Sequence, residues 1–143
     1  MDLKAKQLGI IGEEALALEF IKNGFTVSKP IGDNAPYDLI VDINGILKKI
    51  QVKTTEKVHE GGTMYWVISK SRQNHKNYRK EFYDNEIDGF GLYCIENNYM
   101  GYISKEECDT KYNITLRIEV PKNNMKKGVK FSKDYTLKRI MGE

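Results

Sequence analysis

The N-terminal part of the chain has the hydrophobic and polar pattern of a helix. Residues 5–23 are rich in Ala, Leu, Glu and Lys, which are good helix formers, and Gly24 follows where a helix commonly ends. At helical spacing, the polar side consists of Glu19, Lys22 and Asn23. The opposite side, which we expect to face the core, consists of Ile10, Ala17, Phe20 and Ile21.

Short apolar or alternating runs after this helix predict a sheet. These runs cover residues 25–29, 37–43, 46–54, 64–68, 89–95, 99–103 and 114–120. The dipeptide Asn44-Gly45 between the second and third runs is a strong signal for a two-residue hairpin turn. A helix followed by a mixed sheet built from hairpins predicts an α/β (α+β) fold in a single domain of residues 1–143.

Four further segments carry weaker patterns. Residues 71–84 are polar and aromatic, and are expected to form a helix or a loop. A helical turn is expected to start at Ser104, because Glu107 follows at the spacing of a capping box. Residues 121–130 form a basic loop in this interpretation, and residues 134–140 form a final helix.

Composition excludes several classes of protein. A chain of 143 residues with 40% hydrophobic and 30% charged residues is neither disordered nor of low complexity. No apolar run is long enough to cross a membrane and no secretion signal is present, so we expect a cytoplasmic protein. Cys94 and Cys108 are then expected to be free thiols, with Cys94 and Trp66 in the core.

Charge is segregated along the chain. Residues 61–80 carry five basic side chains and no acid, residues 81–110 carry eight acids against one lysine, and residues 111–143 carry nine basic side chains against three acids. This distribution favours binding of a polyanion such as nucleic acid, although a basic segment can also be merely solvated. The candidate DNA contacts are Lys70, Arg72, Lys76, Arg79, Lys80, Lys122, Lys126, Lys127 and Lys130. The acidic block is expected to lie away from them and to serve a subunit contact.

The predicted hairpin brings polar groups together. Residues that pair across its turn have numbers that sum to about 89, so Asp38 lies close to Gln51. Strand alternation places Gln51 and Lys53 on one face and the apolar pair Ile50 and Val52 on the other. A carboxylate, an amide and an ammonium group therefore meet at one end of the hairpin.

This group of side chains suits a hard divalent cation, which prefers oxygen ligands. Asp38 offers a charged oxygen, whereas the Gln51 side chain and the Val52 backbone offer carbonyl oxygens. A helix carboxylate, Glu13 or Glu14, can complete the shell. The Lys53 ammonium can orient water or stabilise charge on a phosphorane. The group thus indicates metal-assisted phosphodiester hydrolysis. The alternative is an exposed polar strand face with a plain Asp–Lys pair.

Three motifs resemble those of the PD-(D/E)XK nuclease superfamily, and in particular its group I intron-associated endonucleases. The motifs are Gly12-Glu13 on the helix, the segment Pro30-Ile31-Gly32-Asp33-Asn34-Ala35-Pro36-Tyr37-Asp38-Leu39, and Gln51-Val52-Lys53-Thr54. The strong likeness covers residues 9–55, and the chain is also similar to archaeal Holliday-junction resolvases. Most of the superfamily carries Glu or Asp where this chain has Gln51.

The resemblance implies the nuclease fold, with the N-terminal helix packed on a central mixed sheet. It also implies a metal-dependent endonuclease that cuts double-stranded DNA, with Mg²⁺ as cofactor and Mn²⁺ able to substitute. Its catalytic set is Glu13, Asp38, Gln51 and Lys53, and its metal ligands are Glu13, Asp38, Gln51 and Val52. Because Gln51 removes one negative charge, we expect weakened metal affinity.

Two alternatives keep the fold and change the function. One is a module that binds DNA junctions or DNA ends with little or no cleavage, and the other is a protein-interaction domain with a decayed site. Chemically suitable residues at Glu13, Asp38 and Lys53 favour DNA cleavage or binding. Cutting both strands needs two sites, which predicts a homodimer or homotetramer. His59 and His75 lack a metal-ligand spacing and are expected to contact solvent or phosphate.

Overall fold

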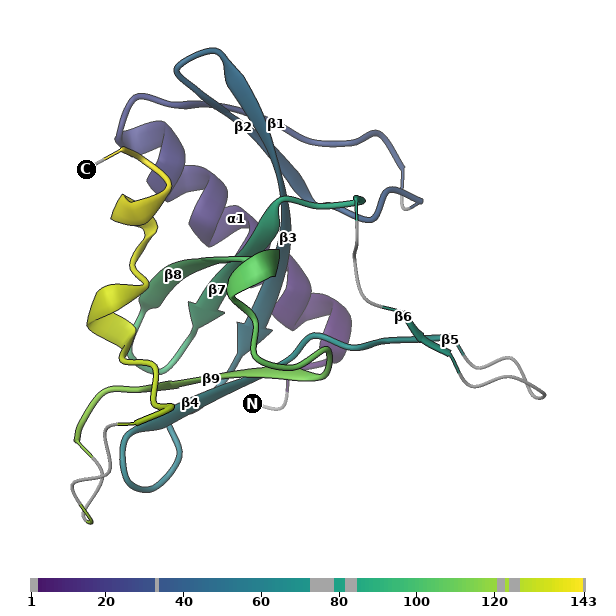
Figure 1. Cartoon of the computed structure of the whole chain (residues 1–143). Coiled ribbons are helices and arrows are strands. Elements are labelled where there is room, and N and C mark those ends of the chain that lie inside the picture. The colour runs from purple at the N-terminus through teal and green to yellow at the C-terminus, as the bar shows by residue number, and fades with distance from the viewer. Residues whose placement is uncertain are drawn as a thin grey trace.

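The computed structural model describes residues 3–32, 34–72, 79–81, 85–120, 123 and 127–142. Figure 1 shows one long helix and a set of strands. Their bounds are α1 (Ala5–Lys22), β1 (Thr26–Ser28), β2 (Leu39–Ile43), β3 (Ile46–Thr55), β4 (Thr63–Val67), β5 (Lys70–Arg72), β6 (Arg79–Glu81), β7 (Gly89–Cys94), β8 (Tyr99–Ser104), η1 (Lys105–Glu107), β9 (Asn113–Arg117), η2 (Ser132–Asp134) and η3 (Leu137–Arg139). The architecture confirms the predicted α+β fold.

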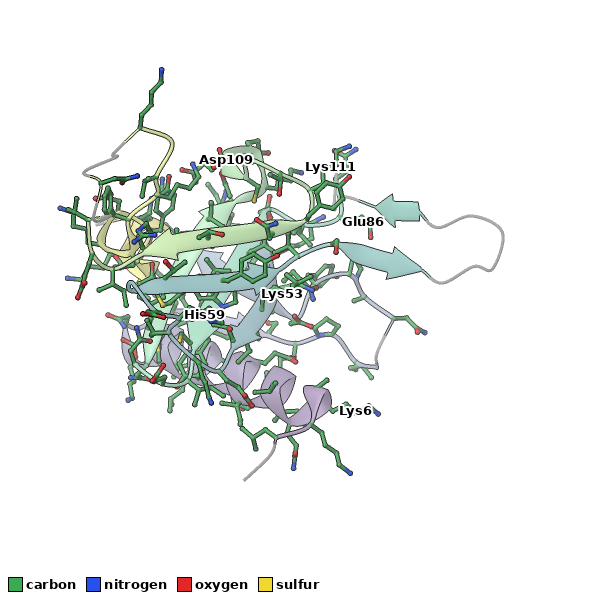
Figure 2. The ribbon with its side chains drawn as sticks, turned by 90° about the horizontal axis from the view of Figure 1, so that it is seen from below. Lys6, Lys53, His59, Glu86, Asp109 and Lys111 are labelled. Carbon is green, nitrogen blue, oxygen red and sulfur yellow. The ribbon has the colours of Figure 1, made fainter. Side chains whose placement is uncertain are left out.

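The molecule has three layers, which are seen edge-on in Figure 2. The middle layer is a five-stranded sheet in the order β1-β2-β3-β7-β8, in which β3 and β7 are parallel and the other neighbours are antiparallel. Helix α1 covers one face of this sheet, and the antiparallel pair β4–β9 covers the other. Strand β3 therefore lies at the centre of the fold, between two cores.

The turn of the β2–β3 hairpin has the geometry that Asn-Gly favours. Both turn residues have positive φ angles, 52° at Asn44 and 89° at Gly45. Leu39 pairs with Ile50, which confirms the predicted register. The side chains of Ile50 and Val52 are buried in the core under α1, so Gln51 and Lys53 leave β3 on the opposite face.

The buried side of helix α1 matches the predicted one in part. Ala17 and Phe20 are buried as predicted, whereas Ile10 and Ile21 are 59% and 55% exposed, and Gly12 and Leu16 complete the buried side instead. Apolar residues occur on more than one side of this helix, so their spacing does not identify the buried side. The buried side is the one that includes Gly12, where the helix backbone lies against β3.

Two segments adopt structures other than those predicted. The described parts of residues 71–84 belong to an antiparallel hairpin, β5–β6, rather than to a helix or loop. Residues 134–140 do not form a continuous helix, because Tyr135 uses its carbonyl to accept the N–H of Tyr102 at the edge of β8 (2.8 Å). The edge pairing lies between two short 3₁₀ turns, η2, which ends at Asp134, and η3, which begins at Leu137.

The second core lies between the main sheet and the β4–β9 pair. Trp66 and Cys94 are 1% and 0% exposed there, as predicted. The Trp66 indole N–H donates to the carbonyl of Tyr93 (3.0 Å). Both cysteines are free thiols. Within the described residues, no helix combines the length and apolar character needed to cross a bilayer.

Candidate active site

The candidate site is built where β3 extends beyond β2. Strand β3 continues to Thr55, whereas its pairing with β2 ends at Leu39 and Ile50. The edge of β3 from residue 51 onward therefore has no strand partner on that side. The side chain of Asp38, directly before β2, occupies this edge.

Asp38 is fixed by two hydrogen bonds to β3. Its backbone N–H donates to the carbonyl of Ile50, and its Oδ2 accepts the N–H of Val52, both at 2.8 Å. The carboxylate thus takes the place of the next backbone partner in the ladder. This contact fixes the direction of the carboxyl group at the point where the two strands separate.

Carbonyl groups at the same edge offer further oxygen atoms. The Lys49 carbonyl accepts the N–H of Asp88 on the β7 side, whereas the Ile50 carbonyl accepts the N–H of Asp38 on the β2 side, each at 2.8 Å. Because carbonyls alternate along a strand, the Val52 carbonyl points to the side of Asp38. Gln51 follows Ile50, the last residue of β3 that pairs with β2, and its side chain is partly buried.

Glu13 reaches the same place from α1. A cavity of about 470 Å³ is lined by Glu13 and Asp38 together with Lys29, Tyr37 and parts of residues 30–35. Glu14 is exposed and forms an ion pair with Lys29 at this cavity instead of lining it. The helix thus places Glu13 beside Asp38 and turns Glu14 outward.

The two carboxyl groups influence each other electrostatically. Burial raises the pKa of Glu13, the nearby Asp38 raises it further, and Lys29 opposes the rise. Burial also raises the pKa of Asp38, whereas the Val52 N–H, the Lys53 ammonium and the Lys29 ammonium oppose the rise. A pair of desolvated carboxylates with raised pKa values is typical of a site that receives a cation or transfers a proton.

The side chain of Lys53, labelled in Figure 2, leaves β3 on the face opposite α1. Its positive charge opposes the rise in the pKa of Asp38. The structure therefore brings Glu13, Asp38 and Lys53 to one edge of β3, from the helix, the start of β2 and the middle of β3.

The oxygen atoms at this site suit a hard divalent cation, although only two of the described groups that carry them are charged carboxylates. Carboxylate oxygens of Glu13 and Asp38 and the carbonyl of Val52 are oxygen ligands of the kind that Mg²⁺ and Mn²⁺ bind. Within the described residues, no cluster of three or more His, Cys, Asp or Glu side chains is suited to hold a metal. Gln51, the remaining predicted ligand, is partly buried on β3 and is not among the described residues that line the cavity.

The sequence profile of the PD-(D/E)XK endonuclease family matches residues 3–138, almost the whole chain. This chain belongs to the PD-(D/E)XK endonuclease family. Its function is therefore that of a nuclease, and the convergence of Glu13, Asp38 and Lys53 falls in the part of the chain that carries the family motifs. A search among curated protein sequences finds no match.

Two solved structures share the fold of this PD-(D/E)XK endonuclease. A bacterial homing endonuclease, I-Ssp6803I, is 25% identical with a TM-score of 0.79, and the alignment covers 98% of this chain and 95% of that one. The Holliday junction resolvase Hjc of the archaeal hyperthermophile Archaeoglobus fulgidus is 12% identical with a TM-score of 0.52, covering 94% of this chain and 96% of that one. Both likenesses support the nuclease fold predicted from the motifs.

The predicted DNA contacts of this PD-(D/E)XK endonuclease are only partly described. Lys76, Lys122 and Lys126 lie outside the described residues. The backbone positions of Lys70, Arg72, Arg79 and Lys80 lie on the β5–β6 hairpin, which extends from the body in Figure 1, and Lys127 is exposed. Of the two histidines expected to contact solvent or phosphate, His59 is exposed beside β4, and His75 lies outside the described residues.

Lys130, a predicted DNA contact, makes contacts within the protein, and its side chain is only 22% exposed. Its ammonium pairs with Asp109 at 3.5 Å and lies 5.6 Å from the ring centre of Tyr135. Arg139 likewise pairs with Glu107. The expectation that the acidic block lies away from the basic segments is therefore wrong at these two contacts, because the chain brings its basic C-terminal part back onto η1 and the loop after it.

Sequence reasoning misses Lys29, which lines the cavity with Glu13 and Asp38. The strand pattern marks this lysine only as the end of a short strand. The available signal is its position directly before Pro30, where the segment shared with the family begins. The sequence position of Lys29 does not indicate where its side chain points. That direction is set only when β1 pairs with β2.

Proposed function

We propose that this nuclease is a divalent-metal-dependent endonuclease that hydrolyses phosphodiester bonds in double-stranded DNA, in the manner of a homing endonuclease. The observation that carries the proposal is the meeting of Glu13 and Asp38 in one cavity, beside the edge of β3 that bears Lys53. The likeness to a bacterial homing endonuclease along nearly the whole of both chains supports the class of substrate.

The side chains have separate tasks in this proposal. The carboxylates of Glu13 and Asp38, with the Val52 and Gln51 carbonyls, would hold Mg²⁺ or Mn²⁺, and the bound ion would lower the pKa of a water and polarise the phosphodiester. Lys53 orients the attacking water and stabilises the negative charge that develops on the phosphorus oxygens. The Val52 N–H keeps Asp38 in a fixed orientation throughout (2.8 Å).

The test is a cleavage assay with Mg²⁺ or Mn²⁺ on supercoiled, linear and four-way-junction DNA. Lys53→Ala and Asp38→Asn should each lower the rate by at least about a hundredfold, since each removes a group that acts on the transition state. Asp38→Asn should also weaken Mn²⁺ binding measured by calorimetry, whereas Lys53→Ala should not. A Lys53→Ala protein that cuts at the wild-type rate would falsify the proposed mechanism.

The same assay separates cleavage from binding alone. Because the described residues that line the cavity supply two carboxylates, Glu13 and Asp38, and residue 51 is an amide rather than an acid, a DNA-junction or DNA-end binding module with little cleavage is the second candidate. Wild-type protein that binds a four-way junction tightly, and cuts none of the three DNA forms with either metal, would establish that alternative.

A further inference from the structure

The cavity of the candidate site has a cation at its rim that the proposed chemistry does not use. Lys29 follows β1, lines the cavity with Glu13 and Asp38, and forms an ion pair with the exposed Glu14. It is the only cationic side chain among the described residues that line this cavity. Lys53, by contrast, acts on Asp38 from β3.

The position of Lys29 differs from that of a purely structural ion-pair partner. Its side chain is 40% exposed and that of Glu14 is 64% exposed, so the pair lies in solvent and contributes little to stability. The Lys29 ammonium also acts electrostatically on both cavity carboxyls. One ammonium group is thus shared between an outer carboxylate and the carboxylates inside the cavity.

The charges of the loaded site leave Lys29 available for an anion. Two carboxylates and a divalent cation sum to zero, so the ion would satisfy Glu13 and Asp38 without help from Lys29. The other described residues of the cavity wall are Pro30, Gly32, Ala35 and Tyr37, none of which has a basic side chain. An anion that enters the cavity therefore meets Lys29 at its rim.

We propose that Lys29 is a substrate-binding residue of this nuclease that contacts a backbone phosphate of the bound DNA strand, next to the phosphate that is cut. This inference rests on the proposed function for the identity of the anion. Glu14 holds the ammonium at the rim before the strand arrives. Lys29 acts in binding, whereas Lys53 acts on the reacting group.

The experiment measures the salt dependence of binding and the kinetics of cleavage for matched variants. Binding of a fluorescent duplex of mixed sequence is followed with Ca²⁺, a hard divalent cation that takes oxygen ligands, over a range of salt concentrations, and plasmid cleavage is followed with Mn²⁺. The variants are Lys29→Ala, Lys29→Arg, Glu14→Gln and the control Lys138→Ala. Lys138 is exposed, belongs to η3 and does not line the cavity.

Loss of one phosphate contact should reduce the slope of log affinity against log salt by about one. Lys29→Ala should show this reduction and a raised KM, with kcat changed no more than a few-fold. Lys29→Arg should keep the wild-type slope, because the charge remains. Glu14→Gln should also keep it, whereas a role limited to the ion pair would make Glu14→Gln and Lys29→Ala equally impaired. Lys138→Ala should match the wild type.

Three outcomes among the variants overturn the inference. They are a Lys29→Ala protein with the wild-type slope and KM, an equal loss in Lys138→Ala, and an equal loss in Glu14→Gln. Failure of the proposed function is a separate result. Wild-type protein that binds the duplex but cuts no DNA still has a salt dependence of binding, and Lys29→Ala can still be compared with it. Wild-type protein that neither binds nor cuts DNA overturns both proposals.

Discussion

Gly12 lies where α1 comes closest to β3. A Cβ atom at this position would lie 1.9 Å from Oγ1 of Thr54 and 3.3 Å from Cγ1 of Val52. Thr54 has a β-branched side chain with only one rotatable bond, so it cannot move aside cheaply. The absence of a side chain at Gly12 therefore sets the distance between the helix and the strand, and with it the position of Glu13.

We predict that Gly12→Ala destabilises the protein by roughly 1–3 kcal/mol, the usual effect of an overpacked contact, and lowers Mn²⁺ affinity. Thermal unfolding and calorimetry measure the two effects. The matched variant is Thr54→Ala, whose removed hydroxyl is buried without a hydrogen-bond partner, so this change alone should be near neutral.

The double variant Gly12→Ala/Thr54→Ala should recover part of the stability and of the metal affinity. Recovery is partial because Val52 and the Cβ of residue 54 remain within 3.3 Å of the added methyl group. Equal losses in the single and double variants would show that the contact with Thr54 is not the cause.

Gln51 is the residue at which the charge of the site can be changed with little change in shape. We predict that Gln51→Glu lowers the Mg²⁺ concentration needed for half-maximal cleavage by about tenfold, because a carboxylate replaces a neutral carbonyl near the cation. A titration of activity against Mg²⁺ measures this. The control is Gln7→Glu, which makes the same chemical change at an exposed position near the start of α1. An unchanged half-saturating concentration in Gln51→Glu would count against Gln51 as a ligand.

At the scale of the elements, the turns η1 and η3 are joined by a bidentate salt bridge between Glu107 and Arg139. Arg139 donates to both carboxylate oxygens of Glu107, at 3.0 and 2.6 Å, and its guanidinium lies 4.5 Å from the ring centre of Tyr135. The hydrogen bonds from Arg139, together with those from Ser104, lower the pKa of Glu107 to about 2, although burial opposes the shift. The bridge attaches the C-terminal turns to the end of β8.

We predict that Arg139→Ala destabilises the protein by about 1 kcal/mol at neutral pH, because both groups are about one-third exposed and the bridge is screened by solvent. A lowered pKa contributes stability above the unfolded value near 4.5, and this contribution is lost as the pH falls toward 2. The difference between the variant and the wild type should therefore shrink between about pH 4.5 and pH 2 in thermal unfolding.

The exposed neighbour Lys138 provides the control for this bridge, since Lys138→Ala changes a charge in the same turn. A difference between Arg139→Ala and the wild type that stays constant across this pH range would exclude the ionised bridge as its cause.

Individual elements are predicted well where the signal is local. The bounds of α1 and the register of β2–β3 follow from helix formers, from Gly24 and from Asn44-Gly45, all of which act within a few residues. The register of this hairpin is also what brings Asp38 beside the strand that carries Gln51 and Lys53, so this part of the site follows from the turn.

The elements that the patterns do not predict depend on partners far along the chain. The parallel pairing of β3 with β7, and the pairing of β4 with β9, leave no mark in the strand patterns, because an apolar run does not specify which strand it joins. Residues 134–140 have a helical pattern, yet the free edge of β8 competes for the backbone of Tyr135. For Lys29, the strand pattern gives no direction toward the cavity.

At the scale of the whole molecule, a break in both DNA strands needs two sites, whereas the described residues of one chain form one candidate site. We predict that the protein is a homodimer or homotetramer in solution and that its subunits cut different strands. Sedimentation equilibrium should give a multiple of the 16.5 kDa chain mass. Mixing wild-type with Lys53→Ala protein should yield nicked plasmid in place of linear plasmid.

The mixing experiment needs subunits that exchange, so the two chains are also co-expressed with different tags and purified as a mixed assembly. The arrangement would be contradicted by a protein that sediments as a monomer at every concentration and still converts supercoiled plasmid directly to linear plasmid in one binding event.

The pairing of distant strands has a consequence for the newly made chain. Glu13, Asp38 and Lys53 have all been synthesised once the ribosome passes residue 53, but β3 gains its second neighbour from residues 89–94, and the opposite core is closed by residues 113–117. Contacts this distant along the chain form slowly and late. The nascent chain therefore carries all three candidate catalytic groups before the sheet that aligns them has formed, and we expect it to have no nuclease activity until synthesis is nearly finished.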